Sequence, residues 1–520
     1  MSKNPWMEKI KLTYLFYDLE TTGLSPAFDQ IIQFAAIRLD ENFHEIARYN
    51  MRIRLSEDVI PHPQALWVNK ISPHLFMTGE HEYKAIQQIY ELVNTPGTIN
   101  VGYNTFGFDE EFFRFSFFRH LLPPYRHQYA NECRRMDIFL MVMMAQQVQP
   151  DLLKWPIVDG KISFKLEKLA HENNFTSGVS HDALVDVQDT IALAKILHQH
   201  TAFWHEATQF FDKQVDKEKL TVPSTYHMID NANHALGLLL DKFPNSPIIP
   251  ALHLSEHKKY ANQHGWLRLD EFDFQIQPIE TVANSVRFLR KKNGESPFVF
   301  DYHDERLLIK LSLDMQGRVQ NNLQWLTEHP DVFKAMQERF LNTEYHADLF
   351  DVNAALYKTP FPTPIEESLL RKFHLIENSR KKEVITQLNP IYQTLAIRLL
   401  GRHLPNALGD QDKEIYAQYI RTVFSMDINT PYLDHHGQSK LTVREAIIET
   451  DKLLREKTKP EEQQFLQVLK DWYHTQDRLP IARNQQTQTS ALGPDGLFMA
   501  QQAAHPKRER DEVSFCNAPC

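Results

Sequence analysis

Cysteine is scarce in this chain, which has three cysteines in 520 residues. Cys516 and Cys520 stand at the end of the sequence, and Cys133 lies far from both. Cysteines so few and so placed exclude the disulfide framework on which small secreted domains depend. We therefore expect a reducing compartment and a cytoplasmic protein.

Long apolar segments are missing as well. The longest apolar run covers residues 138–145, far short of the ~20 residues that cross a bilayer, so it predicts a core helix and no membrane partner. Lys3, Glu8 and Lys9 lie where a signal peptide would need an apolar segment. We expect no signal peptide.

Positive charge is not in excess. Lys and Arg number 57 against 67 Asp and Glu, for a formal net charge of −10. Because Lys and Arg contacts to phosphate dominate affinity for nucleic acids, this balance excludes a protein that is basic all over, but not a local basic channel. Lys165 and the basic runs at 134–135, 287–292 and 380–382 are candidates for such a channel, although most charge runs are solvated surface.

Acidic residues, in contrast, stand out at three places in the first two hundred residues. Asp18 and Glu20 lie in the first, Asp109 in the second, and Asp186 in the third, which opens with His181. Together they supply four carboxylates and an imidazole, the groups that two divalent ions and an activated water need for phosphodiester hydrolysis. The combination predicts a nuclease.

The first acidic segment follows an apolar and aromatic run, residues 12–17, that predicts a buried strand. Carboxylates at the end of such a strand must be neutralised, and a metal would do so. Asp18 and Glu20 are one residue apart, so on a strand both side chains leave the same face. Residues 21–23 then turn the chain, with a glycine that lets backbone approach a ligand. A charged hairpin tip is the alternative for this segment alone.

In the second segment, Asp109 stands at the head of a predicted helix. It could cap that helix by accepting backbone N–H bonds, and the sequence does not separate this role from metal binding. The aromatic run that follows, residues 112–118, predicts core packing ahead of a surface on which bases stack.

The third segment precedes a helix whose apolar stripe runs from Ala183 to Leu197. Asp182 or Ser180 is a plausible N-cap. Asp186 then lies about one turn inside the helix and His181 just outside it, an arrangement that suits a fixed metal ligand and a mobile base.

These motifs, Asp-x-Glu-Thr-Thr-Gly, an aspartate after Asn-Thr-Phe-Gly-Phe, and His-x-Ala-x-x-Asp, resemble those of the DEDD exonucleases in the subtype with a histidine. Within that superfamily the chain is similar to the bacterial exodeoxyribonuclease I family, whose members degrade single-stranded DNA from the 3′ end. The closer match rests on residues 100–104, 155–156, 163–169, 351–357 and 398–405.

The resemblance implies an α/β ribonuclease H-like exonuclease domain, a mixed sheet with flanking helices, over residues 1–203. It implies an SH3-like domain at 204–345, where short apolar runs broken by Pro and Asn predict a β-rich fold. Helical stripes predict a helical C-terminal domain at 346–484. The composition of residues 485–520 predicts a disordered tail.

The resemblance also implies roles for the site residues. Asp18 would bridge two Mg²⁺ ions, for which Mn²⁺ can substitute, while Glu20 and Asp186 complete one ion site and Asp109 helps to hold the other. His181 would accept the proton of the attacking water. Residues expected to contact the DNA are Glu20, Thr21, Thr22, Gly23, Leu24 and Lys165.

Further expectations follow from the same family. We expect a monomer that binds single-stranded DNA and the acidic C-terminal tail of the single-stranded DNA-binding protein. One departure concerns the turn after Pro63, where the family usually has a glycine and this chain has Lys70, so the shape of that loop stays open.

Two alternatives remain. A DEDD-type exoribonuclease or a proofreading exonuclease would use the same five residues, but such proteins are usually far shorter. A catalytically inactive nucleic-acid-binding scaffold is disfavoured because all five catalytic positions are filled.

Overall fold

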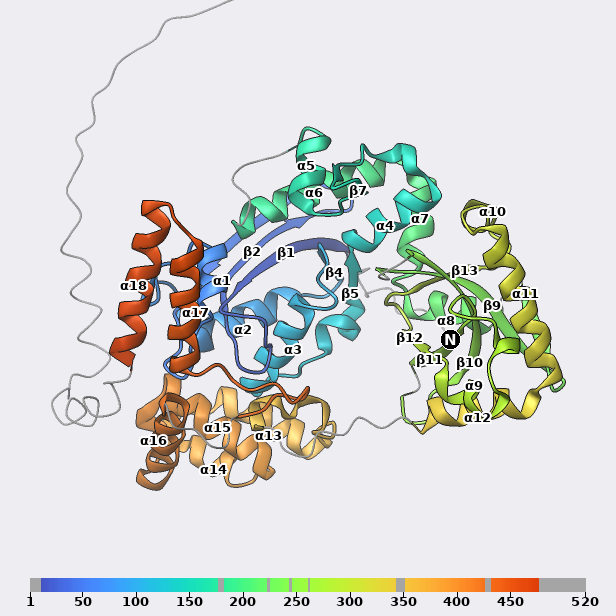
Figure 1. Ribbon diagram of the computed structural model, residues 1–520. Coiled ribbons are helices and arrows are strands. Elements are labelled where there is room, and N and C mark those ends of the chain that lie inside the picture. Colours follow the sequence, from blue (N-terminus) through green and yellow to red (C-terminus); the bar gives the residue numbers. More distant parts are fainter. Residues whose placement is uncertain are drawn as a thin grey trace, which may run out of the picture.

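The computed structural model of this chain describes residues 11–175, 182–221, 225–242, 246–260, 262–342, 351–425 and 432–476. A five-stranded sheet with helices on both faces lies at the centre, between a β-rich part and a helical part (Figure 1). In these ranges no helix combines the length and apolar character needed to cross a bilayer.

The central sheet has the strand order β3-β2-β1-β4-β5. Strand β2 pairs antiparallel with both β1 and β3, whereas β4 pairs in parallel with both β1 and β5. The predicted mixed sheet is therefore confirmed. The strands of this part, with the short hairpin β6–β7, are β1 (Thr13–Thr21), β2 (Ile31–Leu39), β3 (Glu45–Arg52), β4 (Thr98–Gly102), β5 (Arg134–Asp137), β6 (Ile157–Val158) and β7 (Lys161–Ile162).

Alternation along β1 divides its side chains between two cores. Leu15 and Tyr17 face a cluster that includes α2 and α3, whereas Phe16 faces a cluster that includes α4 and α6. The apolar run at 138–145 lies in the core helix α4, as predicted. The helices are α1 (Pro63–Val68), α2 (Glu82–Val93), α3 (Asp109–Arg119), α4 (Ile138–Val148), α5 (Leu166–Glu172), α6 (Ala183–Gln199), α7 (Thr201–Gln209) and α8 (Lys213–Thr221).

The predicted β-rich part is present as a six-stranded antiparallel sheet. The predicted boundary at residue 203 falls inside α7, whose Trp204 ring packs edge-on against Tyr14 of the nuclease sheet. The elements are β8 (Tyr226–Ile229), β9 (Ala232–Leu240), β10 (Ile248–Glu256), β11 (Gln263–Arg268), α9 (Ile279–Ser285), β12 (Phe288–Lys292), β13 (Phe298–Asp301), α10 (Glu305–Leu308), α11 (Leu313–Glu328) and α12 (Pro330–Leu341).

The predicted helical part packs directly on the nuclease part. Phe115 and Phe118 of α3 share a buried cluster with Leu395 and Leu399 of α15, and in Figure 1 the two C-terminal helices stand beside α1. The helices are α13 (Pro364–Leu375), α14 (Lys381–Ile385), α15 (Pro390–His403), α16 (Asp410–Phe424), α17 (Val443–Glu456) and α18 (Pro460–Gln476). The predicted tail at 485–520 lies outside the described residues.

Candidate active site

Asp18 and Glu20 occupy the carboxyl end of β1, opposite Ala35 and Gln33 of β2. A register shift after Glu20 ends the regular pairing and begins the turn. Asp18, Glu20 and Asp186 each present one carboxylate oxygen within 4.8 Å of the other two. The structure thus brings together three of the four predicted metal ligands.

Asp186 reaches this point because α6 packs on β1 and β2. The helix begins at Ala183, and the side chain of its N-cap Asp182 accepts a 2.9 Å hydrogen bond from the Leu184 N–H. Asp186 lies one turn inside, as predicted. His181 precedes the helix and lies outside the described residues, so its predicted role stays a prediction.

Asp109 arrives from the opposite face of the sheet, as the first residue of α3. Since β4 runs parallel to β1, the carboxyl ends of the two strands lie at the same edge, and the segment after β4 carries Asp109 to β1. The N-cap position belongs to Phe108, with no side-chain cap. Asp109 is therefore not the N-cap, although its carboxylate accepts backbone hydrogen bonds from Asp109 and Leu19 that lower its pKa against burial. Its predicted role in metal binding stays a prediction.

These carboxylates destabilise one another's charged forms. Burial, followed by the charges of Asp109, Glu20 and Asp186, raises the pKa of Asp18 well above its usual value. Burial and the charges of Asp186 and Asp109 raise the pKa of Glu20 from 4.5 to about 8. Burial likewise raises the pKa of Asp109 well above its usual range. Buried like charges need protons or cations to neutralise them, and an all-oxygen donor set fits a hard divalent ion.

The turn after Glu20 is fixed by hydrogen bonds. Thr22 Oγ donates to Asp29 Oδ1 at 2.9 Å, and the Thr21 hydroxyl donates to the Gly23 carbonyl at 2.7 Å. A Cβ at Gly23 would lie 2.3 Å from the His62 ring and 2.4 Å from Asp29. Close packing of the protein on itself therefore requires the glycine at this position.

Leu24 projects from this turn with 79% of its surface exposed. Its predicted contact with the last nucleotide stays a prediction. Lys165 is also exposed and forms the N-cap of α5. It follows Phe164, whose carbonyl accepts a hydrogen bond from Tyr103, at the start of the segment that leads to Asp109.

The backbone conformation of Lys70 defines the turn after α1, where the family usually has a glycine. Lys70 follows the C-cap of α1 with φ of 56°, a left-handed conformation that favours glycine. The Ile71 N–H donates to the Leu66 carbonyl at 3.0 Å, as in a Schellman turn. The lysine therefore adopts the backbone conformation that glycine usually supplies.

Asp137 was not predicted from the sequence. It ends β5, and its carboxylate accepts hydrogen bonds from the backbone N–H groups of Asn104, Phe106 and Phe139 at 2.8, 3.3 and 3.0 Å. Burial raises the pKa of Asp137 to about 6, although these hydrogen bonds act to lower it. Asp137 thus positions the segment that carries Asp109. An aspartate directly before the apolar helix at 138–145 was its one sequence signal, as an N-cap.

Three basic residues named as candidates for a DNA channel are internal instead. Arg135 contacts Glu110 and Glu295, Lys291 pairs with Asp216 at 2.5 Å, and Lys381 donates to the Phe373 carbonyl. All three are buried. These three residues therefore neither lie on solvated surface nor are accessible to DNA, because residues distant in the sequence enclose each of them.

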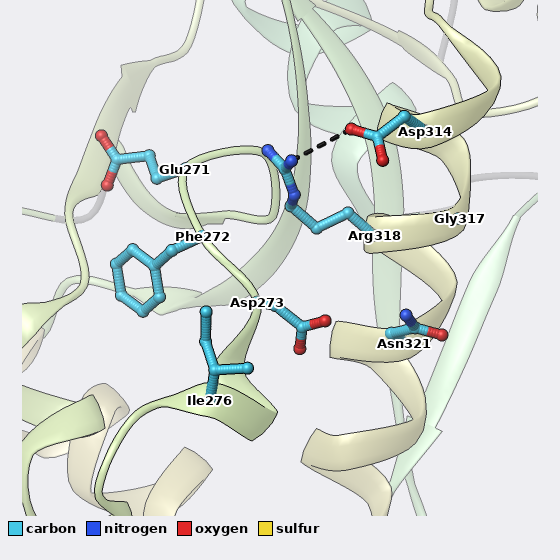
Figure 2. A pocket seen from close by; sticks show the side chains of 8 residues that line it. All are labelled: Glu271, Phe272, Asp273, Ile276, Asp314, Gly317, Arg318 and Asn321. Carbon is cyan, nitrogen blue, oxygen red and sulfur yellow. Dashed lines mark hydrogen bonds and ion pairs between the residues drawn. The ribbon is translucent and has the colours of Figure 1, made fainter.

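A separate hollow of about 480 Å³ lies in the β-rich part, between the segment 271–276 and α11 (Figure 2). Arg318 lies beside Asp314 there at 3.1 Å, with Glu271 and Asp273 nearby. The hollow contains none of the predicted site residues.

Comparison with known proteins identifies the family. A family profile described as "Exonuclease" (RNase_T) matches residues 15–194, a range that holds all five predicted catalytic residues. Exodeoxyribonuclease I of Buchnera aphidicola subsp. Baizongia pistaciae (strain Bp) is 33% identical over 434 residues, which are 80% of this chain and 88% of that protein. The chain belongs to the exodeoxyribonuclease I family. This confirms the predicted family, and the exonuclease domain with its acidic cluster makes this a divalent-metal enzyme.

Two further relatives show how far the likeness reaches. Exodeoxyribonuclease I of Escherichia coli (strain K12) is 35% identical over 192 residues, 36% of this chain and 40% of that protein, so the match spans less than half of this relative. A crystal structure of E. coli exonuclease I in complex with a dA16 oligonucleotide has a TM-score of 0.77 at 21% identity and covers 90% of this chain and 100% of that chain. The predicted three-part fold is confirmed.

Proposed function

We propose that this chain is a 3′-to-5′ exonuclease that hydrolyses single-stranded DNA to 5′-mononucleotides. The observation that carries the proposal is the meeting of Asp18, Glu20 and Asp186 at the end of β1, with Asp109 close enough to raise the pKa values of Asp18 and Glu20. Membership of the exodeoxyribonuclease I family supports the choice of substrate and direction.

The metal is proposed to be Mg²⁺, with Mn²⁺ as a substitute. Asp18, Glu20 and Asp186 would hold one ion, and Asp109 together with Asp18 would hold a second. When bound, the metal supplies a water of lowered pKa and stabilises negative charge on the leaving 3′ oxygen. The all-oxygen donor set is what supports Mg²⁺ over zinc.

The chain's own residues do the remaining work. His181, neutral near pH 7, would accept the proton of the attacking water. Leu24 would pack against the terminal nucleotide beside the turn at Thr21, Thr22 and Gly23. Lys165, exposed at the start of α5, would contact a backbone phosphate.

The direction and strand preference can be tested with oligonucleotides labelled at the 5′ end. One has a free 3′ hydroxyl, one a bulky 3′ block, one is in a blunt duplex, and one is RNA of the same sequence. We expect rapid shortening of the free single strand alone, abolished by EDTA. Cleavage of the blocked strand would contradict an exonuclease entering at the 3′ end, and RNA cut as fast as DNA would favour the exoribonuclease alternative.

His181→Gln is expected to lower turnover by roughly two to four orders of magnitude, the usual contribution of a positioned general base. His171→Gln, at an exposed histidine of α5, is the matched control and should leave turnover within twofold. Single-turnover cleavage at saturating DNA measures both. A loss confined to DNA affinity would show that His181 is not the base.

We also propose a cytoplasmic monomer that binds the acidic C-terminal tail of the single-stranded DNA-binding protein, as its family suggests. Sedimentation of the purified chain tests whether it is a monomer. Fluorescence anisotropy with an acidic C-terminal peptide, against the same peptide with its acids changed to amides, tests whether it binds the tail. Equal binding of both peptides would contradict recognition of the acidic tail.

A further inference from the structure

A second cluster of metal-binding side chains lies where the nuclease part meets the helical part. Glu82 begins α2, His120 is the C-cap of α3, and His403 ends α15. Each presents one ligand atom within 4.8 Å of the other two. The cluster therefore joins three helices, one of which comes from the C-terminal part of the chain.

The spacing of these atoms suits a single small ion. Glu82 Oε2 lies 3.8 Å from His120 Nε2 and 3.5 Å from His403 Nε2. Tetrahedral zinc with bonds of about 2.0–2.1 Å separates its ligand atoms by about 3.4 Å. Both distances from Glu82 are within a few tenths of an ångström of that separation, and the two imidazole nitrogens lie within 4.8 Å of each other.

His120 Nε2 and His403 Nε2 each lack a hydrogen-bond partner among the residues that the structure describes. The His120 side chain is fully buried, and the His403 side chain is 6% exposed. A buried polar atom without a partner costs about 1–3 kcal/mol. Two such nitrogens directed at one carboxylate indicate a missing ligand.

The surroundings of His120 hold it in the form that binds metals. Its Nδ1 lies 2.7 Å from the Ser116 carbonyl, which can only accept, so Nδ1 carries the proton and Nε2 keeps its lone pair. Burial lowers the pKa of His120 to about 3, so the ring is neutral. The Ser56 hydroxyl donates to Glu82 Oε2 at 2.6 Å and orients that carboxylate.

Arg402 is the competing cation. Its Nη1 lies 3.8 Å from both Glu82 Oε2 and Asp58 Oδ2, beyond hydrogen-bond distance of either. Its Nη2 has no hydrogen-bond partner in the described chain, so this nitrogen does not bond to either imidazole. The guanidinium therefore balances charge without occupying the ligand atoms.

A route for an ion is present. Glu82 and His403 line a cavity of about 380 Å³ whose other walls include Arg402, Phe76 and Trp472. Water in that cavity could supply a fourth ligand, the arrangement of zinc sites with two histidines and a glutamate.

We propose that Glu82, His120 and His403 bind one divalent transition-metal ion, best matched by Zn²⁺, which ties the nuclease part to the helical part. The site is independent of the proposed nuclease activity. Its nitrogen ligands favour zinc, whereas the all-oxygen cluster at Asp18 favours Mg²⁺.

Zinc retention by the full chain tests the proposal. The changes Asp18→Asn and Asp186→Asn are introduced first, so that the acidic cluster no longer contributes. The protein is loaded with Zn²⁺, dialysed against metal-free buffer, and assayed for zinc per chain. We expect about one ion for this background and at least a tenfold loss on adding His403→Gln.

His374→Gln is the matched control. His374 is partly buried and its ring also stacks on Tyr83, but it is not one of the three ligands. It should retain the ion. No zinc in the background protein, or equal zinc in the His403→Gln and His374→Gln variants, would overturn the proposal.

Cobalt gives a second readout that does not depend on any variant of the three ligands. The background protein loaded with Co²⁺ should show the intense visible absorption of a four-coordinate ion, and Zn²⁺ should displace it. Weak absorption typical of six-coordinate Co²⁺ would contradict the proposed site.

Discussion

Asp109 and Glu110 are adjacent, both are buried at the start of α3, and their electrostatic situations are opposite. Burial and nearby acids raise the pKa of Asp109 well above its usual value. For Glu110, burial is outweighed by His127, Arg135 and Arg114, which hold its pKa far below the usual value. His127 Nε2 lies 3.0 Å from Glu110 Oε2, and Arg135 donates to the same oxygen at 3.2 Å.

The difference separates a structural carboxylate from a functional one. A pair of unit charges 4 Å apart contributes about 4 kcal/mol at an effective dielectric of 20. Around Glu110 this energy is favourable and holds α3 against β5. Around Asp109, Asp18 and Glu20 the electrostatic energy is unfavourable. A cation bound between these carboxylates would offset the repulsion, as is typical of functional sites.

The largest expected effect comes from removing one functional carboxylate. Asp18→Asn should lower the rate of single-strand cleavage by on the order of 10³-fold, because metal ligands supply several kcal/mol of transition-state stabilisation. In EDTA its melting temperature should equal or exceed that of the parent, since one repelling charge is gone. Cleavage within tenfold of the parent, or a destabilised variant, would break the comparison.

The structural carboxylate should behave in the opposite way. Glu110→Gln should lower the free energy of unfolding by about 3 kcal/mol, because Arg135 and His127 lose their buried partner. Glu91→Gln, at an exposed site on α2, is the control and should change it by less than about 0.5 kcal/mol. Urea denaturation measures both. Equal stability of the two variants would mean that the Glu110 network is not a net stabilising one.

Asp137 is the intermediate case, a buried carboxylate with a pKa near 6 that bonds only to backbone N–H groups in the contacts described above. Asp137→Asn should lower turnover by about 10- to 100-fold, the usual effect of losing a residue that orients a metal ligand. Addition of more metal should recover part of the loss. Unchanged turnover at limiting metal would show that the segment before Asp109 holds itself in place.

Local pattern was enough to predict some of this site. The two-residue period of a strand places Asp18 and Glu20 on one face, and the N-cap Asp182 fixes where α6 begins and hence where Asp186 lies. Three motifs along one stretch of chain also identified the family. These inferences needed no knowledge of contacts between distant residues.

Partnerships across the fold could not be predicted in the same way. Asp137 meets Asn104 33 residues away, and Arg135 meets Glu295 160 residues away. No local pattern near Lys291 predicts that its ammonium group will form a buried ion pair with Asp216. Arg135, Lys291 and Lys381 were misread for this reason, and Glu110 passed unnoticed beside Asp109.

The most direct test measures how metal stabilises the protein as the pH changes. Because the pKa of Glu20 is raised from 4.5 to about 8, the metal-free folded state binds protons that the unfolded chain releases over this range. Stability in EDTA should therefore fall as the pH rises from about 4.5 to about 8. Bound metal replaces those protons, so the gain in melting temperature on adding Mg²⁺ should grow with pH over the same range. A double variant, Asp18→Asn with Glu20→Gln, should show little gain at any pH. A gain in the parent that is independent of pH, or that shrinks as the pH rises, would contradict the account.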